Sequence, residues 1–197
     1  EKEFITRKFL LEKEKIPELN DKTLVDKFSI LISESQSQIR TYAEAHLMHI
    51  AKVNEASEDI KARSRSIVSL RDIQRVFVLF RYFCSEDEHK LAKGSIERAV
   101  LLAVGCVYYF RLDTTSRKKY RDHIDTKCAA FRVNIDTVLN DAMSQVLQET
   151  YIQKGIAKTK GLKENIFLTW LCTAVRMPLM IIGPPGSSKT LAVNIVI

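Results

Sequence analysis

Proline and glycine are scarce in this 197-residue sequence, and their positions limit the possible folds. The four prolines lie at 17, 178, 184 and 185, so none occurs between residues 18 and 177, and the whole chain holds only six glycines. Because both residues interrupt helices, a long stretch that is poor in them is typical of helical structure. The sequence therefore predicts a mainly helical fold over about the first three quarters of the chain.

Long apolar runs and paired cysteines are also missing. No run approaches the roughly 18 apolar residues that a membrane span needs, and we find no signal peptide in the sequence as given. The four cysteines, at 84, 106, 128 and 172, are widely separated and form no Cys-x-x-Cys pair. Reduced thiols in a cytoplasmic protein are therefore expected, without a transmembrane segment and with no metal site built from these cysteines.

The net positive charge could indicate a nucleic-acid partner or only a solvated or phosphate-facing basic surface. The formal net charge is +7, although charged residues make up an ordinary 28% of the chain. Basic residues gather in two segments, one with Lys61, Arg63, Arg65, Arg71, Arg75 and Arg81, the other with Arg117, Lys118, Lys119 and Arg121. The aromatic residues near them fall at helical core spacing and not as a stacking platform for bases. We therefore expect a solvated or phosphate-facing basic surface, and no nucleic-acid partner.

Apolar periodicity predicts a series of helices. The strongest begins at Ser69, where Ser69 and Asp72 resemble a capping box and the apolar residues from Ile73 to Phe83 follow at helical spacing. A second helix opens at Ser95 and is nearly continuous in apolar residues, so we expect it to be buried. The remaining helical segments are expected at about 21–54, 116–129, 135–152 and 165–176.

Residues 178–190 carry the strongest chemical signal. The apolar residues 179–182 predict a strand, and a loop rich in glycine, proline and serine follows before an apolar helical segment. This order is the setting of a phosphate-binding loop, whose backbone N–H groups and following helix N-terminus surround the phosphates of a nucleotide. The candidate nucleotide-binding residues are Gly183, Pro184, Pro185, Gly186, Ser187, Ser188, Lys189 and Thr190.

Two of these residues have specific predicted roles, and one departs from the general pattern. Lys189 is expected to reach the β and γ phosphates, and the Thr190 hydroxyl to bind Mg²⁺, which prefers oxygen ligands. The usual spacing has a second fixed glycine where this chain has Ser188. A non-glycine residue takes a left-handed conformation at a cost of roughly 1 kcal/mol, so this substitution weakens the match without excluding it. The alternative is an ordinary turn that ends in Lys-Thr.

The composition divides the chain. A polar, basic stretch that contains Gly155 and Gly161 begins at Lys154 and indicates a domain boundary. The predicted division is a helical region at 1–88, a helical linker region at 89–154, and the start of a nucleotide-binding core at 155–197. The predicted fold class is thus mainly α, followed by the truncated start of an α/β phosphate-loop core, and both chain ends are expected to be cuts within a longer protein.

Two segments together resemble a known family. Residues 68–76, Val-Ser-Leu-Arg-Asp-Ile-Gln-Arg-Val, followed by Phe-Arg-Tyr-Phe at 80–83, resemble the late helix of the AAA+ lid in mysterin-type giant ATPases. Residues 161–168 and then 177–192, with the Ser-Ser-Lys ending at 187–189, are similar to the start of the next AAA+ module in the same proteins. The apolar segment 101–109 is similar too. Residues 1–60 and 113–155 show no resemblance that we can assign.

The resemblance implies a piece that spans the lid of one AAA+ module and the start of the next, in a RING-finger ubiquitin ligase. It implies ATP and Mg²⁺ as cofactors, neighbouring AAA+ modules of the same chain as partners, and Arg71 as a sensor-2-like residue over the nucleotide of the first module. A ubiquitin-conjugating enzyme and zinc are implied only for other parts of such a protein, since no RING-type Cys/His spacing occurs in this sequence. No catalytic residue is assigned, and this chain alone is expected to bind nucleotide weakly and not to hydrolyse it.

Two other functions stay open on the sequence. One is a tandem AAA+ mechanical remodeller of the midasin or dynein type, which a downstream Cys/His zinc pattern would argue against. The other is a non-enzymatic helical interaction module whose terminal loop is fortuitous; in that case Lys189 tolerates substitution.

Overall fold

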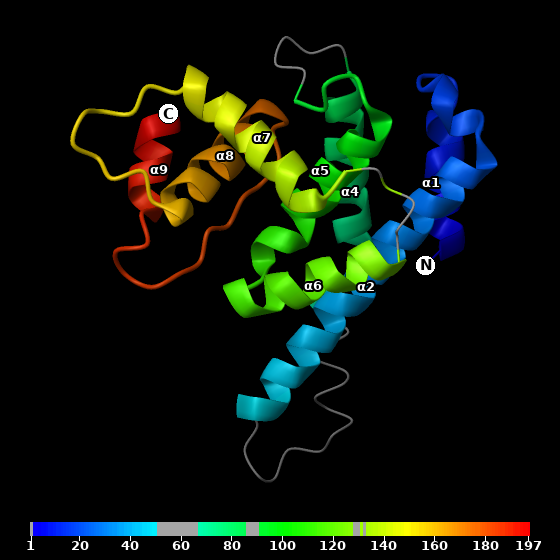
Figure 1. Cartoon of the computed structure of the whole chain (residues 1–197), viewed down its shortest axis with the longest axis horizontal. Helices are drawn as coiled ribbons and strands as arrows, with labels where there is room; N and C mark the ends of the chain where they lie inside the picture. Colours follow the sequence, from blue (N-terminus) through cyan, green and yellow to red (C-terminus); the bar gives the residue numbers. More distant parts are fainter. Residues whose placement is uncertain (1, 51–66, 86–90, 128–130, 132) are drawn as a thin grey trace.

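The computed structural model describes residues 2–50, 67–85, 91–127, 131 and 133–197 (Figure 1). Within these ranges the chain forms eight α-helices and two short 3₁₀ helices, and it contains no strand. The elements in chain order are α1 (Lys2–Glu12), η1 (Pro17–Asn20), α2 (Lys22–Ile50), α4 (Leu70–Cys84), α5 (Ile96–Val107), η2 (Tyr109–Arg111), α6 (Thr114–Lys127), α7 (Ile135–Glu149), α8 (Lys160–Ala174) and α9 (Lys189–Val196). The predicted mainly helical character is confirmed.

The core is built around α4 and α5, which pack against each other at the centre of the molecule (Figure 1). Helices α1 and α2 lie on one side of this pair, whereas α7 and α8 lie on the other. Phe9 of α1, Phe28 of α2 and Phe80 of α4 meet at ring-centroid distances of 5.5 to 6.3 Å. All three rings are fully buried, so this aromatic cluster joins the first helices to the centre.

Side-chain caps explain where the predicted helices begin. The backbone N–H of Ser69 donates to Oδ2 of Asp72 at 3.0 Å, within the capping box that opens α4. The Ser95 hydroxyl accepts from the backbone N–H of Arg98 at the start of α5, as the sequence predicts. Helix α5 is buried over most of its length, which confirms the expectation drawn from its continuous apolar run. The predicted helices at 21–54, 116–129 and 135–152 are observed as α2, α6 and α7, and residues 51–54 and 128–129 lie outside the described residues.

Helix α8 begins earlier than predicted. The sequence predicts a linker through Gly161 and a helix from Asn165, whereas the helix starts at Lys160. The Thr159 hydroxyl accepts from the backbone N–H of Leu162 at 3.2 Å, and this cap places Gly161 in the first helical turn. A glycine in a first turn disturbs a helix less than the sequence pattern suggested.

The predicted strand at 179–182 is not formed. Residues 177–184 have no regular secondary structure, and no strand occurs anywhere in the described ranges. Met180 and Ile182 are 82% and 85% exposed. A β-strand requires a neighbouring strand for its backbone N–H and C=O groups, and the described residues offer none. The α/β core expected at 155–197 is therefore not seen in the described residues, whose regular structure there consists of α8 and α9.

Helix α8 ends in a turn that directs the chain toward the loop. The backbone N–H of Met177 donates to the carbonyl of Cys172 at 2.8 Å, and that of Arg176 donates to the carbonyl of Thr173 at 3.2 Å. Arg176 itself has a φ of 53°, so the pattern is a Schellman motif with arginine in the left-handed position. The chain leaves the helix as an open segment, 177–182, that returns along α8 before α9 begins.

Helix α9 packs on α8 in a small apolar cluster of its own. Ala192 is fully buried between Leu162 and Ile166 of α8, beside the larger core of the molecule. The last turns of α2 project away from the other helices (Figure 1). None of the described helices combines the length and the apolar character that crossing a lipid bilayer requires.

Candidate functional site

The segment 183–190 forms a tight loop that ends at the first residues of α9. Two of its residues have a positive φ, 79° at Gly186 and 60° at Ser188, and both turn the chain. Gly183 opens the loop, where an added Cβ would lie only 2.9 Å from the Ser187 hydroxyl. Both glycines therefore fill positions that a larger residue would strain.

Ser188 takes the left-handed conformation at the position where the general motif has its second glycine. Its φ and ψ are 60° and 22°, and it is the N-cap of α9. Its carbonyl accepts the backbone N–H of Ala192 at 3.0 Å, the first hydrogen bond of that helix. The serine thus adopts the backbone shape that the motif requires, at a cost of about 1 kcal/mol.

The side chain of Lys189 folds back over the loop. Its ammonium donates to the carbonyl oxygens of Gly183 and Pro184, both at 2.8 Å, and to the Ser187 hydroxyl at 3.0 Å. The Ser187 hydroxyl in turn donates to the Pro184 carbonyl at 2.8 Å. Three neutral oxygens therefore hold the positive charge at the loop, and a phosphate oxygen, which carries charge, is a stronger partner for it.

The remaining loop residues are accessible. Pro185 is exposed at the turn, and Thr190 is exposed in the first turn of α9. Lys189 and Thr190 both line an open groove of about 700 Å³ between α8 and α9, whose other walls include Met177 and Val193. Lys189 and Thr190 thus share one groove.

Arg71 lies elsewhere. It is exposed in the first turn of α4, and the groove of about 610 Å³ beside residues 177–182 is lined by Arg75 and Arg111 instead. Arg75 and Arg111 both bind the buried carboxylate of Asp72. The sensor-2-like role of Arg71 concerns a nucleotide of the preceding module, so it stays a prediction.

The residue that attaches the loop to the rest of the protein is not predictable from the sequence. Asn165 of α8 donates its Nδ2 hydrogen to the carbonyl oxygen of Ser187 at 2.9 Å, across 22 residues of sequence. An isolated asparagine in a helix gives no sequence signal for such a contact, because it depends on how the loop folds back along α8.

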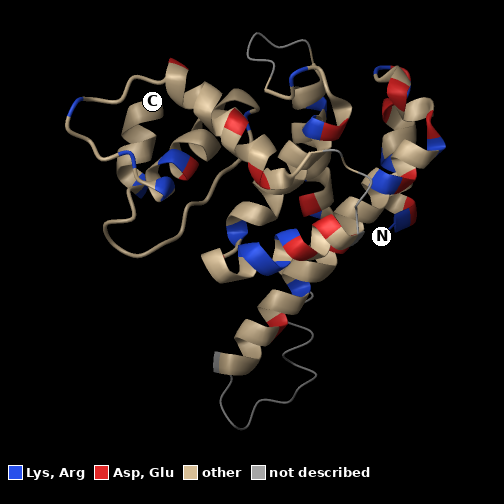
Figure 2. Cartoon of the chain, viewed as in Figure 1, with Lys and Arg blue, Asp and Glu red and all other residues tan. Residues whose placement is uncertain are grey.

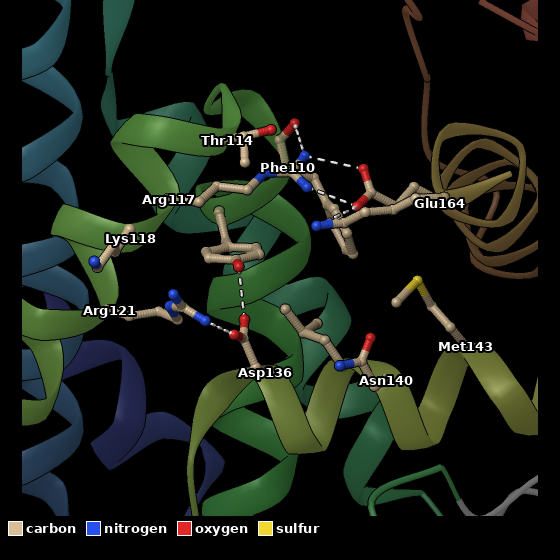
Figure 3. A pocket seen from close by; sticks show the side chains of 12 residues that line it. Phe110, Thr114, Arg117, Lys118, Arg121, Asp136, Asn140, Met143 and Glu164 are labelled. Atoms are coloured by element: carbon tan, nitrogen blue, oxygen red, sulfur yellow. Dashed lines mark hydrogen bonds and ion pairs between the residues drawn. The ribbon is translucent and has the colours of Figure 1, made fainter.

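A second missed feature is the cluster of charges where α6, α7 and α8 meet (Figure 3). Arg117 binds Glu164 through two hydrogen bonds of 2.6 and 3.0 Å, and Arg121 binds Asp136, which also accepts from the Tyr109 hydroxyl. Burial raises the pKa of Tyr109, and its hydrogen bond to the Asp136 carboxylate acts in the same direction. The cluster surrounds a small pocket of about 110 Å³.

Both arginines of this cluster face carboxylates, so the contacts join helices and do not form an open anion site. Basic and acidic residues also occur together on several of the helices (Figure 2). Among the described residues, no group of His, Cys, Asp and Glu is arranged to hold a metal ion.

Comparisons with known proteins identify the relatives of this chain. A family model described as "RNF213 AAA domain" matches residues 155–197, the segment that contains α8, the loop and α9. Three relatives named as E3 ubiquitin-protein ligases of the RNF213 type are similar to the chain: the human protein at 31% identity over 150 residues, the mouse protein at 29% over 150 residues, and the zebrafish protein rnf213-beta at 33% over 144 residues. No solved structure matches the chain.

Residues 155–197 belong to an AAA domain. The chain belongs to the RNF213 (mysterin) family, as the resemblance in the sequence implied. Each alignment covers 66% of this chain but only 3% of the relative, so the chain corresponds to a small part of very long proteins.

Proposed function

We propose that this chain is the junction between two AAA+ modules of a giant ATPase and ubiquitin ligase, and that residues 183–190 bind the phosphates of ATP. Residues 1–88 form the lid-like region of the first module, 89–154 a helical linker region, and 155–197 the opening of the second module. The names of the similar proteins support the ligase assignment for the parent and favour it over a mechanical remodeller. A cytoplasmic location and a ubiquitin-conjugating partner belong to the same proposal.

The observation that carries the phosphate-binding role is the geometry at Ser188 and Lys189. A left-handed residue places the loop at the N-terminus of α9, and the lysine ammonium already lies on the loop carbonyls. When ATP binds, the ammonium exchanges these neutral oxygens for phosphate oxygens, and the positive end of the helix dipole favours the same negative charge. In this proposal the hydroxyl of Thr190, which is exposed in the first turn of α9, binds Mg²⁺ together with the phosphates.

The second module needs more than these residues for catalysis. Hydrolysis requires a carboxylate that holds Mg²⁺ and orients water, and a group that stabilises the transferred phosphoryl. The described residues that line the groove at Lys189 and Thr190 include no acidic side chain. We therefore assign the binding and positioning of the nucleotide to this chain, and the hydrolytic groups to the continuation of the module.

The test is ATP binding in the presence of Mg²⁺ by a protein extended downstream through the complete second module. We expect Lys189→Ala to weaken binding at least about tenfold, since a charge-assisted hydrogen bond contributes about 1.5 to 3 kcal/mol. Lys158→Ala, which removes an exposed lysine just before α8, is the matched control and is expected to bind as the wild type does. If the two variants bind ATP equally well, residues 183–190 are an ordinary turn and not a phosphate-binding loop.

A further inference from the structure

Two adjacent residues of α8 contact opposite parts of the protein. Glu164 binds Arg117 of α6, in the helical part of the chain, whereas Asn165 binds the carbonyl of Ser187 in the candidate phosphate loop. Neighbouring residues on a helix point about 100° apart, so one rigid helix presents the first residue to α6 and the second to the loop. Helix α8 therefore connects the two regions through consecutive side chains.

The contact on the α6 side is strongly determined. The side chains of Arg117 and Glu164 are only 11% and 13% exposed, and the two hydrogen bonds between them are bidentate (Figure 3). The guanidinium also lies 5.1 and 5.5 Å from the ring centroids of Tyr109 and Phe110, and its Nε donates to the Leu112 carbonyl at 2.8 Å. A buried, bidentate and stacked arginine permits very little sliding of α6 against α8.

The contact on the loop side acts on the residue that precedes the left-handed turn. Asn165 holds the Ser187 carbonyl, and the hydroxyl of Ser187 is one of the three oxygens around the Lys189 ammonium. Ser188, next along the chain, has the positive φ that starts α9. A displacement of Asn165 is therefore passed directly to the backbone that positions Lys189.

We propose that the linkage from Arg117 through Glu164 and Asn165 to Ser187 lets the helical region of the chain set the nucleotide affinity of the phosphate loop. This inference rests on the proposed function, since it concerns the regulation of the same site. Asn165 is a positioning residue in this account, and it acts on phosphate only through the loop. A movement of α6 that breaks or shifts the Glu164 ion pair changes the position of α8 and relaxes the loop.

The first test measures amide hydrogen exchange in this chain without nucleotide. Asn165→Ala and the paired variant Arg117→Gln with Glu164→Gln, which leaves no buried charge unpaired, are compared with the wild type. We expect the amide of Ser187, which donates to the Pro184 carbonyl, to exchange several-fold faster in both variants, because each loses a contact that orders the loop. The amide of Met177, bonded to Cys172 at the far end of α8, is the internal control and is expected to be unchanged.

The second test is a double-mutant cycle on ATP affinity in the protein that contains the complete second module. We expect Asn165→Ala to weaken binding about fivefold, as the loss of one hydrogen bond implies. The paired variant is expected to weaken binding by a similar factor in the wild-type background and by no further factor when Asn165→Ala is present, since both changes act through one linkage.

The outcomes separate the two proposals. If Lys189→Ala weakens binding but the paired variant changes neither affinity nor loop exchange, the phosphate loop stands and the linkage is overturned. If the paired variant weakens binding equally in both backgrounds, or speeds exchange at Met177 as much as in the loop, the ion pair is only structural and the linkage is again overturned. If neither Lys189→Ala nor the wild type supports nucleotide binding, the proposed function fails and the linkage with it.

Discussion

The carboxylate of Asp72 binds the guanidinium of Arg111, with 2.5 Å between Oδ1 and Nη2, although 39 residues separate them in the sequence. Asp72 is 4% exposed, and it also accepts from the backbone N–H of Ser69 and from Arg75. One buried carboxylate thus caps the start of α4 and also binds η2, which follows α5. The capping box that the sequence predicts is at the same time a long-range contact.

Replacing Asp72 is expected to destabilise the protein. Asp72→Asn keeps the side-chain size but removes the charge that faces two guanidinium groups, and the loss is expected to be about 2 kcal/mol. Urea unfolding of the chain measures it, with Asp122→Asn, an exposed change on α6, as the control that stays within about 0.5 kcal/mol. Equal midpoints for the two variants would show that the carboxylate contributes nothing beyond its place in the helix.

Two glycine-to-alanine changes in helices are expected to have opposite effects. A Cβ at Gly105 of α5 would lie 2.7 and 2.9 Å from the methyl carbons of Leu139 on α7, and Leu139 is 1% exposed, so it has no room to move. We expect Gly105→Ala to cost about 1 to 3 kcal/mol through overpacking, which exceeds its gain of about 1 kcal/mol in helix propensity.

Gly161 of α8 provides the matched comparison. A Cβ there meets nothing within 4 Å, so Gly161→Ala is expected to stabilise the protein by up to about 1 kcal/mol. Thermal unfolding of both variants should move the midpoint in opposite directions. A gain in both would mean that α5 and α7 separate easily, contrary to the packing observed.

Most of the helices could be predicted from residues close together in the sequence. Where the structure differs from the prediction, the predicted element depended on residues far away in the sequence. Ser69 and Ser95 could be predicted as the starts of their helices because capping involves residues only three positions apart. The strand expected at 179–182 depends on neighbouring strands that the described residues do not contain, so its apolar run had nothing to pair with.

The same distinction applies to the candidate site. The loop could be predicted because its residues are consecutive, and Ser188 takes the left-handed conformation that a glycine usually supplies. The contact from Asn165 to the loop and that from Glu164 to Arg117 could not, since each joins residues at least 22 positions apart. Such contacts are determined by the packing of α8 and have no pattern of their own in the sequence.

Two thiols, the half-buried Cys84 and the buried Cys172, are expected to resist alkylation. Burial, with the nearby carboxylates of Glu18 and Glu12 adding to it, raises the pKa of Cys84 to about 12. Burial also raises the pKa of Cys172 to about 11, against a smaller opposing effect of Arg75. Because the thiolate is the reactive form, iodoacetamide at pH 8 should modify both residues far more slowly in the folded protein than in urea, as peptide mass spectrometry would measure. Equal rates in the two conditions would contradict this account.

These raised pKa values also predict that the free energy of unfolding falls at high pH. Below the ordinary thiol pKa both the folded and unfolded states are protonated, so the thiols contribute no pH dependence there. Above it the unfolded chain releases protons that the folded chain retains, and stability falls as the pH rises. We expect the free energy of unfolding to decline above about pH 9, and to decline less steeply in a Cys84→Ala variant.

Two neighbouring serines of the loop are expected to respond differently to glycine. Ser188→Gly removes the cost of a left-handed side-chain-bearing residue, about 1 kcal/mol, and should order the start of α9. Ser187→Gly removes a hydroxyl that bonds Pro184 and Lys189, and should loosen the same turn. The amide of Ala192, which donates to the Ser188 carbonyl, reports the difference by hydrogen exchange, slower in the first variant and faster in the second. Faster exchange in both would mean that the Ser188 side chain itself stabilises the turn, and the strain argued for that position would be wrong.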